Sequence, residues 1–139
     1  MSIRLDRKKM LTISFFLCCF VPTLFPWFCA GAGTAWRGIQ LLGPLFLVGA
    51  ILYLYALFSK SCRHVLLLGG LAHGVIFLAY LISFFTFPAG RPSFSARLDA
   101  SEPSFWISCI LLAAHLILFV TTETAIRRLL ERRRPRPQH

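Results

Sequence analysis

The fold of this chain is decided by one uninterrupted apolar stretch, residues 65–87, which reads VLLLGGLAHGVIFLAYLISFFTF. The stretch contains no Asp, Glu, Lys or Arg. A helix that crosses a hydrocarbon core of roughly 30 Å needs about 20 apolar residues. A helix also satisfies its backbone hydrogen bonds internally, which the membrane interior requires. The stretch therefore predicts a membrane-spanning helix.

Three further stretches have the same character and lie at residues 10–28, 38–59 and 105–122. None of them contains Asp, Glu, Lys or Arg. The links between the four stretches are short, so sequential helices should be antiparallel neighbours. The predicted fold is all-α: a polytopic membrane protein with an antiparallel bundle of four transmembrane helices in residues 1–124 and a basic tail in residues 125–139.

Composition excludes the main alternatives. The chain has 139 residues, of which 57% are hydrophobic and 14% are charged. A soluble domain carries about 25% charged residues, and disordered chains are poorer in apolar residues than this one. The length suits one domain.

The distribution of basic residues predicts the orientation. Cytoplasmic segments carry an excess of Lys and Arg. With both termini on the cytoplasmic side (N-in/C-in), 12 of the 15 basic residues lie inside and 3 lie outside. The outer three are Arg37, Arg91 and Arg97. The sequence therefore predicts an integral membrane protein with both termini in the cytoplasm.

The first apolar stretch has a competing interpretation as a secretory signal. Basic residues precede it, and Ala30, Gly31 and Ala32 fit a cleavage site of the A-x-A form. The apolar run of about 19 residues is longer than the 7–15 of a typical signal. We expect a retained span, with cleavage as the alternative.

Tryptophans accompany the predicted outer ends of the spans. Trp27, Trp36 and Trp106 all fall there. Tryptophan is enriched at membrane interfaces, where the ring lies among head groups and the N–H meets water. We therefore expect all three indoles at the outer interface.

The end of the chain is strongly basic. Its arginines are Arg127, Arg128, Arg132, Arg133, Arg134 and Arg136. Each basic residue near an anionic membrane surface contributes about 1 kcal/mol of attraction, so the predicted partners are the lipid bilayer and anionic lipid head groups. A membrane-protein partner or a second copy of the chain is an alternative, whereas nothing here resembles a nucleic-acid-binding fold. Glu123 and Arg127 have the spacing of an ion pair on one helix.

Two histidines lie inside the predicted spans, where an ionisable residue suggests a functional site. At 1.5 Å per residue, His73 and His115 lie about 13 Å and about 12 Å from the inner ends of neighbouring antiparallel helices. Tyr80 and Ser108 lie seven residues further outward on the same faces. We expect the two imidazoles to face each other, with Tyr80 and Ser108 as a second polar layer.

This pattern allows three interpretations. Neutral polar side chains can hold membrane helices together at about 0.6 kcal/mol per hydrogen bond. Paired imidazoles can also ligate haem b or a transition metal, or relay protons. We predict the structural role, with no metal or cofactor, and keep haem ligation by His73 and His115 as the alternative.

Small residues lie at the same depth as the histidines. Gly70 and Gly74 form a GxxxG pair with Gly69 beside them, and Cys109 and Ala113 form a small-xxx-small pair. Such faces let helix backbones approach closely in lipid. The five cysteines contain no C-x-x-C motif, and a bridge between Cys29 and Cys109 is conceivable.

Short motifs at the outer ends carry a resemblance. Pro26-Trp27 ends the first helix, a small-residue loop at residues 29–34 follows, and Phe105-Trp106 opens the last helix. In these features the chain resembles small four-span bacterial inner-membrane proteins. The resemblance implies the topology and no activity.

The sequence therefore predicts a non-enzymatic membrane protein with a structural, accessory or regulatory role through its helices and basic tail. A haem- or quinone-linked redox subunit is the first alternative. A small oligomeric transporter is the second.

Overall fold

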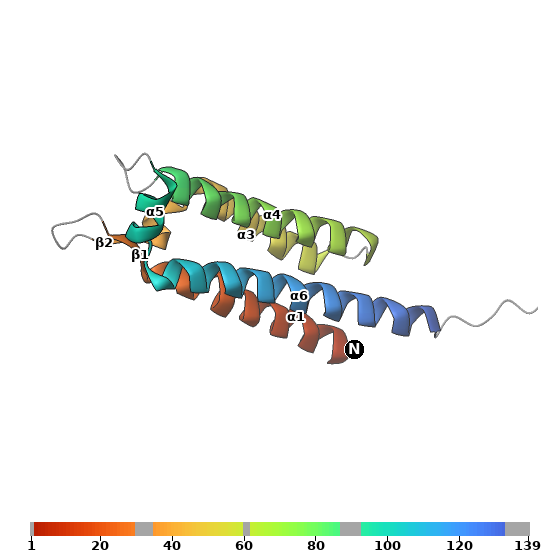
Figure 1. Ribbon diagram of the computed structural model, residues 1–139. Coiled ribbons are helices and arrows are strands. Elements are labelled where there is room, and N and C mark those ends of the chain that lie inside the picture. The colour runs from red at the N-terminus through yellow and green to blue at the C-terminus, as the bar shows by residue number, and fades with distance from the viewer. Residues whose placement is uncertain (1, 30–34, 60–61, 87–92, 133–139) are drawn as a thin grey trace, which may run out of the picture.

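The computed structural model describes residues 2–29, 35–59, 62–86 and 93–132 (Figure 1). Most of these residues are helical. The helices are α1 (Ser2–Phe15), the π-helix η1 (Phe16–Phe20), the 3₁₀-helix η2 (Val21–Leu24), α2 (Gly38–Leu41), α3 (Gly43–Phe58), α4 (Cys62–Thr86), α5 (Phe94–Ala100) and α6 (Pro103–Arg132). Strands β1 (Pro26–Cys29) and β2 (Ala35–Arg37) form a small antiparallel hairpin.

The α1–η1–η2 segment, α3, α4 and α6 lie side by side (Figure 1). Helices α3 and α4 pack against each other, α4 also packs on α6, and α6 lies along α1 and η1. The start of α1 and the end of α6 lie at one end of the molecule, and the hairpin and α5 lie at the other.

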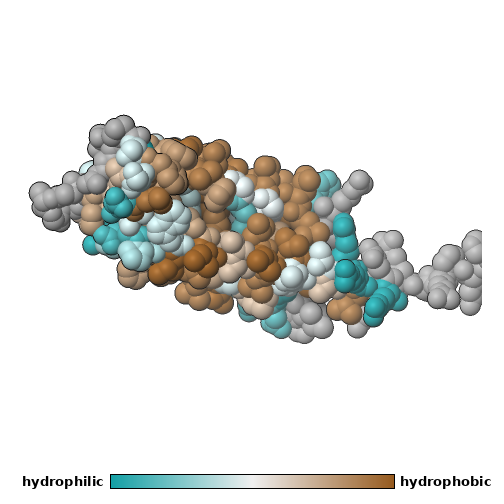
Figure 2. Space-filling model, viewed as in Figure 1, coloured by the Kyte–Doolittle hydropathy of each residue, from teal (hydrophilic) through white to brown (hydrophobic). Residues whose placement is uncertain are grey.

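Two of these helices are long and apolar enough to cross a membrane, namely the segments His64–Thr86 and Pro103–Leu129. Among the described residues, Gly43–Phe58 is a shorter apolar helix. The outward faces of the long helices are brown and apolar along most of their length, and teal hydrophilic residues gather toward the two ends (Figure 2).

The first segment departs from the predicted helix over residues 10–28. The α-helix widens into η1, tightens into η2 and ends at Leu24. Proline explains the end, because Pro22 and Pro26 have no N–H to donate to a helix and Pro26 disfavours helical backbone at the residue before it. Phe25 is accordingly extended, with φ −86° and ψ 159°.

The second segment is also interrupted. Residues 38–59 were expected to form one helix, but α2 ends at Leu41 and α3 begins at Gly43. Gly43 has φ +58°, a conformation that glycine adopts without steric cost. Pro44 then suits the first turn of α3, where its missing N–H has no partner to lose.

A compact cap closes the end of the molecule opposite the start of α1 and the end of α6. The Glu102 N–H donates to the Trp27 carbonyl at 2.8 Å, and the Ser104 hydroxyl donates to the Pro26 carbonyl. The Arg97 guanidinium donates to the carbonyls of Phe84 and Phe85 near the end of α4. These bonds join the hairpin, α5 and α6 to the end of α4.

The cap corrects the expectation for one tryptophan. Trp27 is fully buried, and its indole N–H donates to the Pro22 carbonyl at 3.2 Å instead of meeting water. Its ring packs against Tyr80 and Phe105, with centroids 4.8 and 5.3 Å away. The burial follows from the end of the helix at Leu24, which turns β1 back across the bundle.

The other two tryptophans are partly exposed. Trp36 and Trp106 are 41% and 42% exposed at the cap. The Trp106 indole donates to the Ser101 hydroxyl at 2.9 Å. Both rings suit an interface between apolar and aqueous surroundings.

Candidate functional site

Two buried imidazoles lie in contact at the centre of the helical segments. His73 of α4 and His115 of α6 are 2% and 1% exposed. His73 Nε2 lies 2.8 Å from His115 Nδ1, and the two rings are nearly parallel with centroids 5.1 Å apart. The structure therefore brings together the two histidines that the depth argument placed opposite each other.

The hydrogen bonds of this pair determine where its protons lie. His73 Nδ1 is 2.7 Å from the Gly69 carbonyl, which can only accept, so Nδ1 carries the hydrogen. In a neutral ring, His73 Nε2 must then accept from His115 Nδ1. His115 Nε2 is left as an acceptor for the Tyr53 hydroxyl at 3.4 Å.

Tyr53, His115, His73 and Gly69 thus form one directed chain of hydrogen bonds. We call these four residues the buried polar chain. Each of its donors has an acceptor, and the chain ends on a backbone carbonyl that has no proton to pass on. The Tyr53 hydroxyl also lies 3.5 Å from the Leu11 carbonyl of α1, so a second acceptor is within reach.

Aromatic rings enclose the buried polar chain. Phe15 of α1 stacks on Tyr53 with centroids 4.3 Å apart, and Phe119 of α6 lies 5.7 Å from the His73 ring. Both phenylalanines are buried. Side chains of α1 and α6 therefore keep water from the chain, and the absence of competing water strengthens its hydrogen bonds.

Tyr53 was missed by the sequence analysis. It lies in an apolar stretch with Tyr55 two residues away. Tyr53 is fully buried whereas Tyr55 is 65% exposed. The available signal was its depth: six residues, or about 9 Å, separate it from residue 59 at the inner end of its stretch, against about 13 Å for His73. Sequence alone does not say which of the two tyrosines faces inward.

Tyr80 and Ser108 are buried but do not form the expected joint layer. The Tyr80 hydroxyl donates to the Cys19 carbonyl at 3.4 Å. The Ser108 hydroxyl donates to the Ser104 carbonyl of its own helix at 2.6 Å. Within the described part of the chain, both hydroxyls therefore donate to backbone carbonyls, Tyr80 to η1 and Ser108 to its own helix, and not to each other.

The glycines pack differently from the GxxxG expectation. A Cβ on Gly69 would fall 2.2 Å from Phe119 Cζ, so α6 approaches α4 here. A Cβ on Gly70 or Gly74 would meet no described atom within 4 Å, which makes that pair wrong as a packing face. Gly49 of α3 fills the role instead, since its Cβ would lie 3.2 Å from the Ala72 carbonyl.

The two residues of the small-xxx-small pair on α6 also differ in burial. Cys109 is half-buried and packs against the core, whereas Ala113 is exposed. Only Cys109 therefore contributes to packing within the described residues.

A buried ion pair lies at the end of the bundle that carries the chain termini. The Arg7 guanidinium of α1 is 3.3 Å from both carboxylate oxygens of Glu123 on α6. The two side chains are 10% and 5% exposed, and Arg7 Nε has no hydrogen-bond partner among the described residues. The expected pairing of Glu123 with Arg127 is wrong: Glu123 faces α1, whereas Arg127 is exposed.

The two histidines do not fit a haem or metal ion between them. Their nearest nitrogens are 2.8 Å apart and share a hydrogen, whereas two nitrogens that each lie about 2.0–2.1 Å from one tetrahedral ion are about 3.3 Å apart. A haem held by both rings would have to lie between these two nitrogens, which are in direct hydrogen-bond contact. In the described residues, no cluster of three or more His, Cys, Asp or Glu side chains could hold a metal ion.

The cysteines of the described side chains are all free, including Cys29 and Cys109. The Cys29 thiol is exposed on the cap and donates to Glu102 Oε1 at 2.6 Å. This hydrogen bond raises the pKa of Cys29 above its ordinary value, because it stabilises the protonated thiol beside a carboxylate.

The basic tail is described in part. Arg127, Arg128 and Arg132 are exposed near the end of α6, which continues to Arg132 as its lack of Gly and Pro predicts. Outside the described residues lie the remaining tail arginines, the suggested cleavage site and one outer basic residue: Arg133, Arg134, Arg136, Ala30, Gly31, Ala32 and Arg91.

Comparison with known proteins gives no relative. The chain matches no family model, no curated protein and no solved structure. Function must therefore be inferred from the residues of this chain.

Proposed function

We propose that this chain is a small integral membrane protein with a structural, accessory or regulatory role and no catalytic activity. One observation supports the proposal above the others: the described helices expose many large apolar side chains, whereas two histidines are buried between them. Leu47, Leu67 and Ile117 are more than 60% exposed, whereas His73 and His115 are buried. Monomeric soluble proteins rarely expose such extended apolar surface.

In this proposal the four helical segments are four spans. They are the α1–η1–η2 segment, α2 with α3, α4, and α6. Their arrangement side by side gives each a lipid-facing side (Figure 1). The breaks at η1 and Gly43 are tolerated in lipid when neighbouring helices satisfy the freed backbone groups.

We place both termini in the cytoplasm. Described basic residues gather at the end of the bundle where α1 begins and α6 ends: Arg7, Lys8, Lys9, Arg127, Arg128 and Arg132. Arg37 and Arg97 lie at the opposite end. The positive-inside rule then assigns the basic end to the cytoplasm and the cap to the outside, as in a bacterial inner membrane.

The buried polar chain supports a structural role over proton transfer or redox chemistry. All of its donors are satisfied, and its terminal acceptor is a helix carbonyl. Polar contacts of this kind specify which helices meet, in an environment where no hydrophobic drive exists between them. A role through helix packing and the basic tail follows, with lipid or a membrane protein as the partner.

Labelling of engineered cysteines tests this proposal directly. Ser95→Cys on the exposed face of α5 and Arg132→Cys at the end of α6 should react from opposite sides of sealed vesicles, in a background where the native cysteines are replaced by Ala. Ser95→Cys should react from the outside. Reaction of both positions from one side would refute the orientation, and release of the chain by alkaline carbonate would refute membrane insertion.

An absorbance spectrum separates the structural role from the redox alternative. The detergent-purified chain should show no Soret band after expression with excess haem precursor. A Soret band that His73→Leu or His115→Leu abolishes would favour the redox subunit and require the two rings to move apart.

A further inference from the structure

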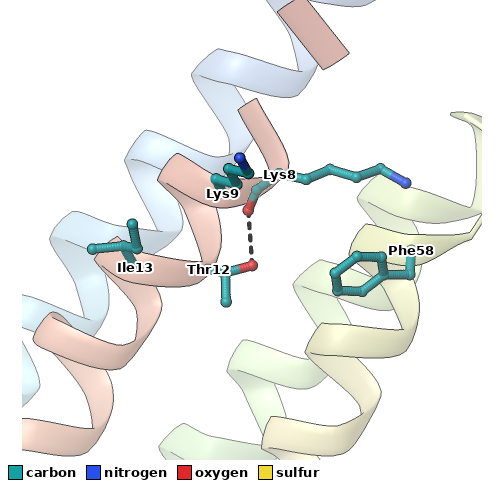
Figure 3. A pocket seen from close by; sticks show the side chains of 5 residues that line it. All are labelled: Lys8, Lys9, Thr12, Ile13 and Phe58. Carbon is teal, nitrogen blue, oxygen red and sulfur yellow. Dashed lines mark hydrogen bonds between the residues drawn. The ribbon is translucent and has the colours of Figure 1, made fainter. Parts of the chain in front are cut away.

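A shallow groove opens between helices α1 and α3 near the basic end of the bundle. Five residues line it: Lys8, Lys9, Thr12, Ile13 and Phe58. Its volume is about 230 Å³. Figure 3 shows the Lys8 side chain reaching from α1 toward the Phe58 ring of α3, with Lys9 beside it and Ile13 further along α1.

The groove offers positive charge at one end. Lys8 Nζ lies 5.2 Å from the centroid of the Phe58 ring, a cation–π distance that holds the ammonium over the groove. The Thr12 hydroxyl donates to the Lys8 carbonyl at 2.7 Å, so its hydrogen is already used. The donors left for a ligand are the two ammonium groups.

The rest of the groove is apolar and faces away from the bundle. Ile13 and Phe58 are 60% and 61% exposed. Ile13 lies four residues after Lys9 on α1, and Phe58 is the last residue of α3, so both lie close to the two lysines. A ligand that fits must therefore combine negative charge with a hydrocarbon portion.

Neighbouring acidic groups do not cancel the charge of the two lysines. Glu123 is the buried carboxylate on this side, and it is paired with Arg7 at 3.3 Å. Asp6 is exposed on the preceding turn of α1. Two lysines and one ion pair beside one exposed carboxylate leave the groove with net positive charge.

We propose that this groove binds one anionic phospholipid of the adjoining leaflet. The phosphate oxygens accept hydrogen bonds from Lys8 and Lys9, and an acyl chain lies along Ile13 and Phe58. The inference rests on the proposed membrane insertion and adds a specific lipid site on α1 and α3, separate from the basic tail. Free phosphate has the charge but would leave the apolar side of the groove uncovered.

Lipid binding to the full-length chain in detergent, counted by native mass spectrometry, tests the site. Delipidated protein should bind one phosphatidylglycerol at least tenfold more tightly than one phosphatidylcholine. Lys8→Gln with Lys9→Gln should weaken phosphatidylglycerol binding about tenfold or more, given the attraction that each basic residue supplies near a membrane surface. Glycerol phosphate, which lacks acyl chains, should not displace the lipid.

A matched control removes the same charge from the same end of the molecule. Arg127→Gln with Arg128→Gln should change the affinity by less than about twofold, and Lys8→Arg with Lys9→Arg should preserve it. Phe58→Ala keeps both lysines but removes an apolar side chain that lines the groove, so it should weaken phosphatidylglycerol binding severalfold. Because Phe58 is exposed, this variant should fold, and it tests the site even if the lysine variant folds poorly.

Three outcomes would overturn the site: equal binding of the two lipids, equal weakening by the lysine and arginine variants, or full displacement by glycerol phosphate. Alkaline carbonate extraction of native membranes distinguishes this failure from failure of the proposed function. A chain that stays in the membrane without lipid selectivity refutes the groove alone.

Discussion

The two imidazoles give a double-mutant cycle with a defined expected value. The changes are His73→Leu, His115→Leu and both together, because leucine fills a similar volume without polar atoms. Each single change removes two of the three hydrogen bonds in the buried polar chain, and the bond between the imidazoles is common to both.

The magnitude follows from this count. At an average of about 0.6 kcal/mol per hydrogen bond in a membrane protein, each single variant should lose about 1.2 kcal/mol of unfolding free energy. The double variant loses three bonds, or about 1.8 kcal/mol. The sum of the two single losses therefore exceeds the loss of the double variant by a coupling energy of about 0.6 kcal/mol.

The assay is reversible unfolding in mixed micelles with increasing SDS, followed by helical circular dichroism. Tyr53→Phe removes one bond of the chain and should cost about 0.6 kcal/mol, whereas Tyr55→Phe, at a 65% exposed position, should be near neutral. Zero coupling between the histidines would refute the hydrogen bond between them. A single-variant loss above about 3 kcal/mol would refute the neutral pair and indicate a buried charge.

Three further changes test other contacts. Gly69→Ala should lower the unfolding free energy by about 2 kcal/mol in the same SDS titration, because the added Cβ has no room. Gly70→Ala places its Cβ in open space and should be neutral or slightly stabilising. Equal effects of the two variants would contradict the packing of α6 on α4. Glu123→Gln should lower the unfolding free energy by about 3 kcal/mol, the low end for breaking a buried ion pair, because it leaves the Arg7 guanidinium unpaired. A loss below about 0.5 kcal/mol would show that the ion pair is exposed to water. Glu102→Gln should lower the pKa of Cys29 toward its ordinary value, so the thiol should react faster with iodoacetamide at pH 8. An unchanged rate would show that the Glu102 carboxylate does not hydrogen-bond the thiol.

Local composition was sufficient to predict the helices but not their interruptions. Long runs without charged residues predict helices over residues 65–87 and 105–122, and α4 and α6 cover the described residues of both. The breaks at η1 and Gly43 depend on how each segment meets its neighbours. Proline and glycine permit such breaks, but they do not determine which residue ends the helix.

The histidine pair could be predicted because depth and helical spacing are properties of single helices. Counting from the basic ends places His73 and His115 at one level, and seven-residue spacing defines a face. The pairing of Arg7 with Glu123 could not be found in this way. It joins residues 116 positions apart on helices whose contact depends on the whole bundle.

The sequence by itself determined that this protein is mostly helical, that it carries four long stretches without charged residues, and that its basic residues gather near the ends of these apolar runs. These properties depend on residue type and spacing along one chain segment. Only the tertiary structure decided that Tyr53 and not Tyr55 completes the buried polar chain, that Trp27 turns inward, and that Gly69 and not the GxxxG pair receives α6. Each of these depends on the rotation of a helix about its own axis. An apolar helix in lipid has no polar face to set that rotation, so the contacts between helices set it.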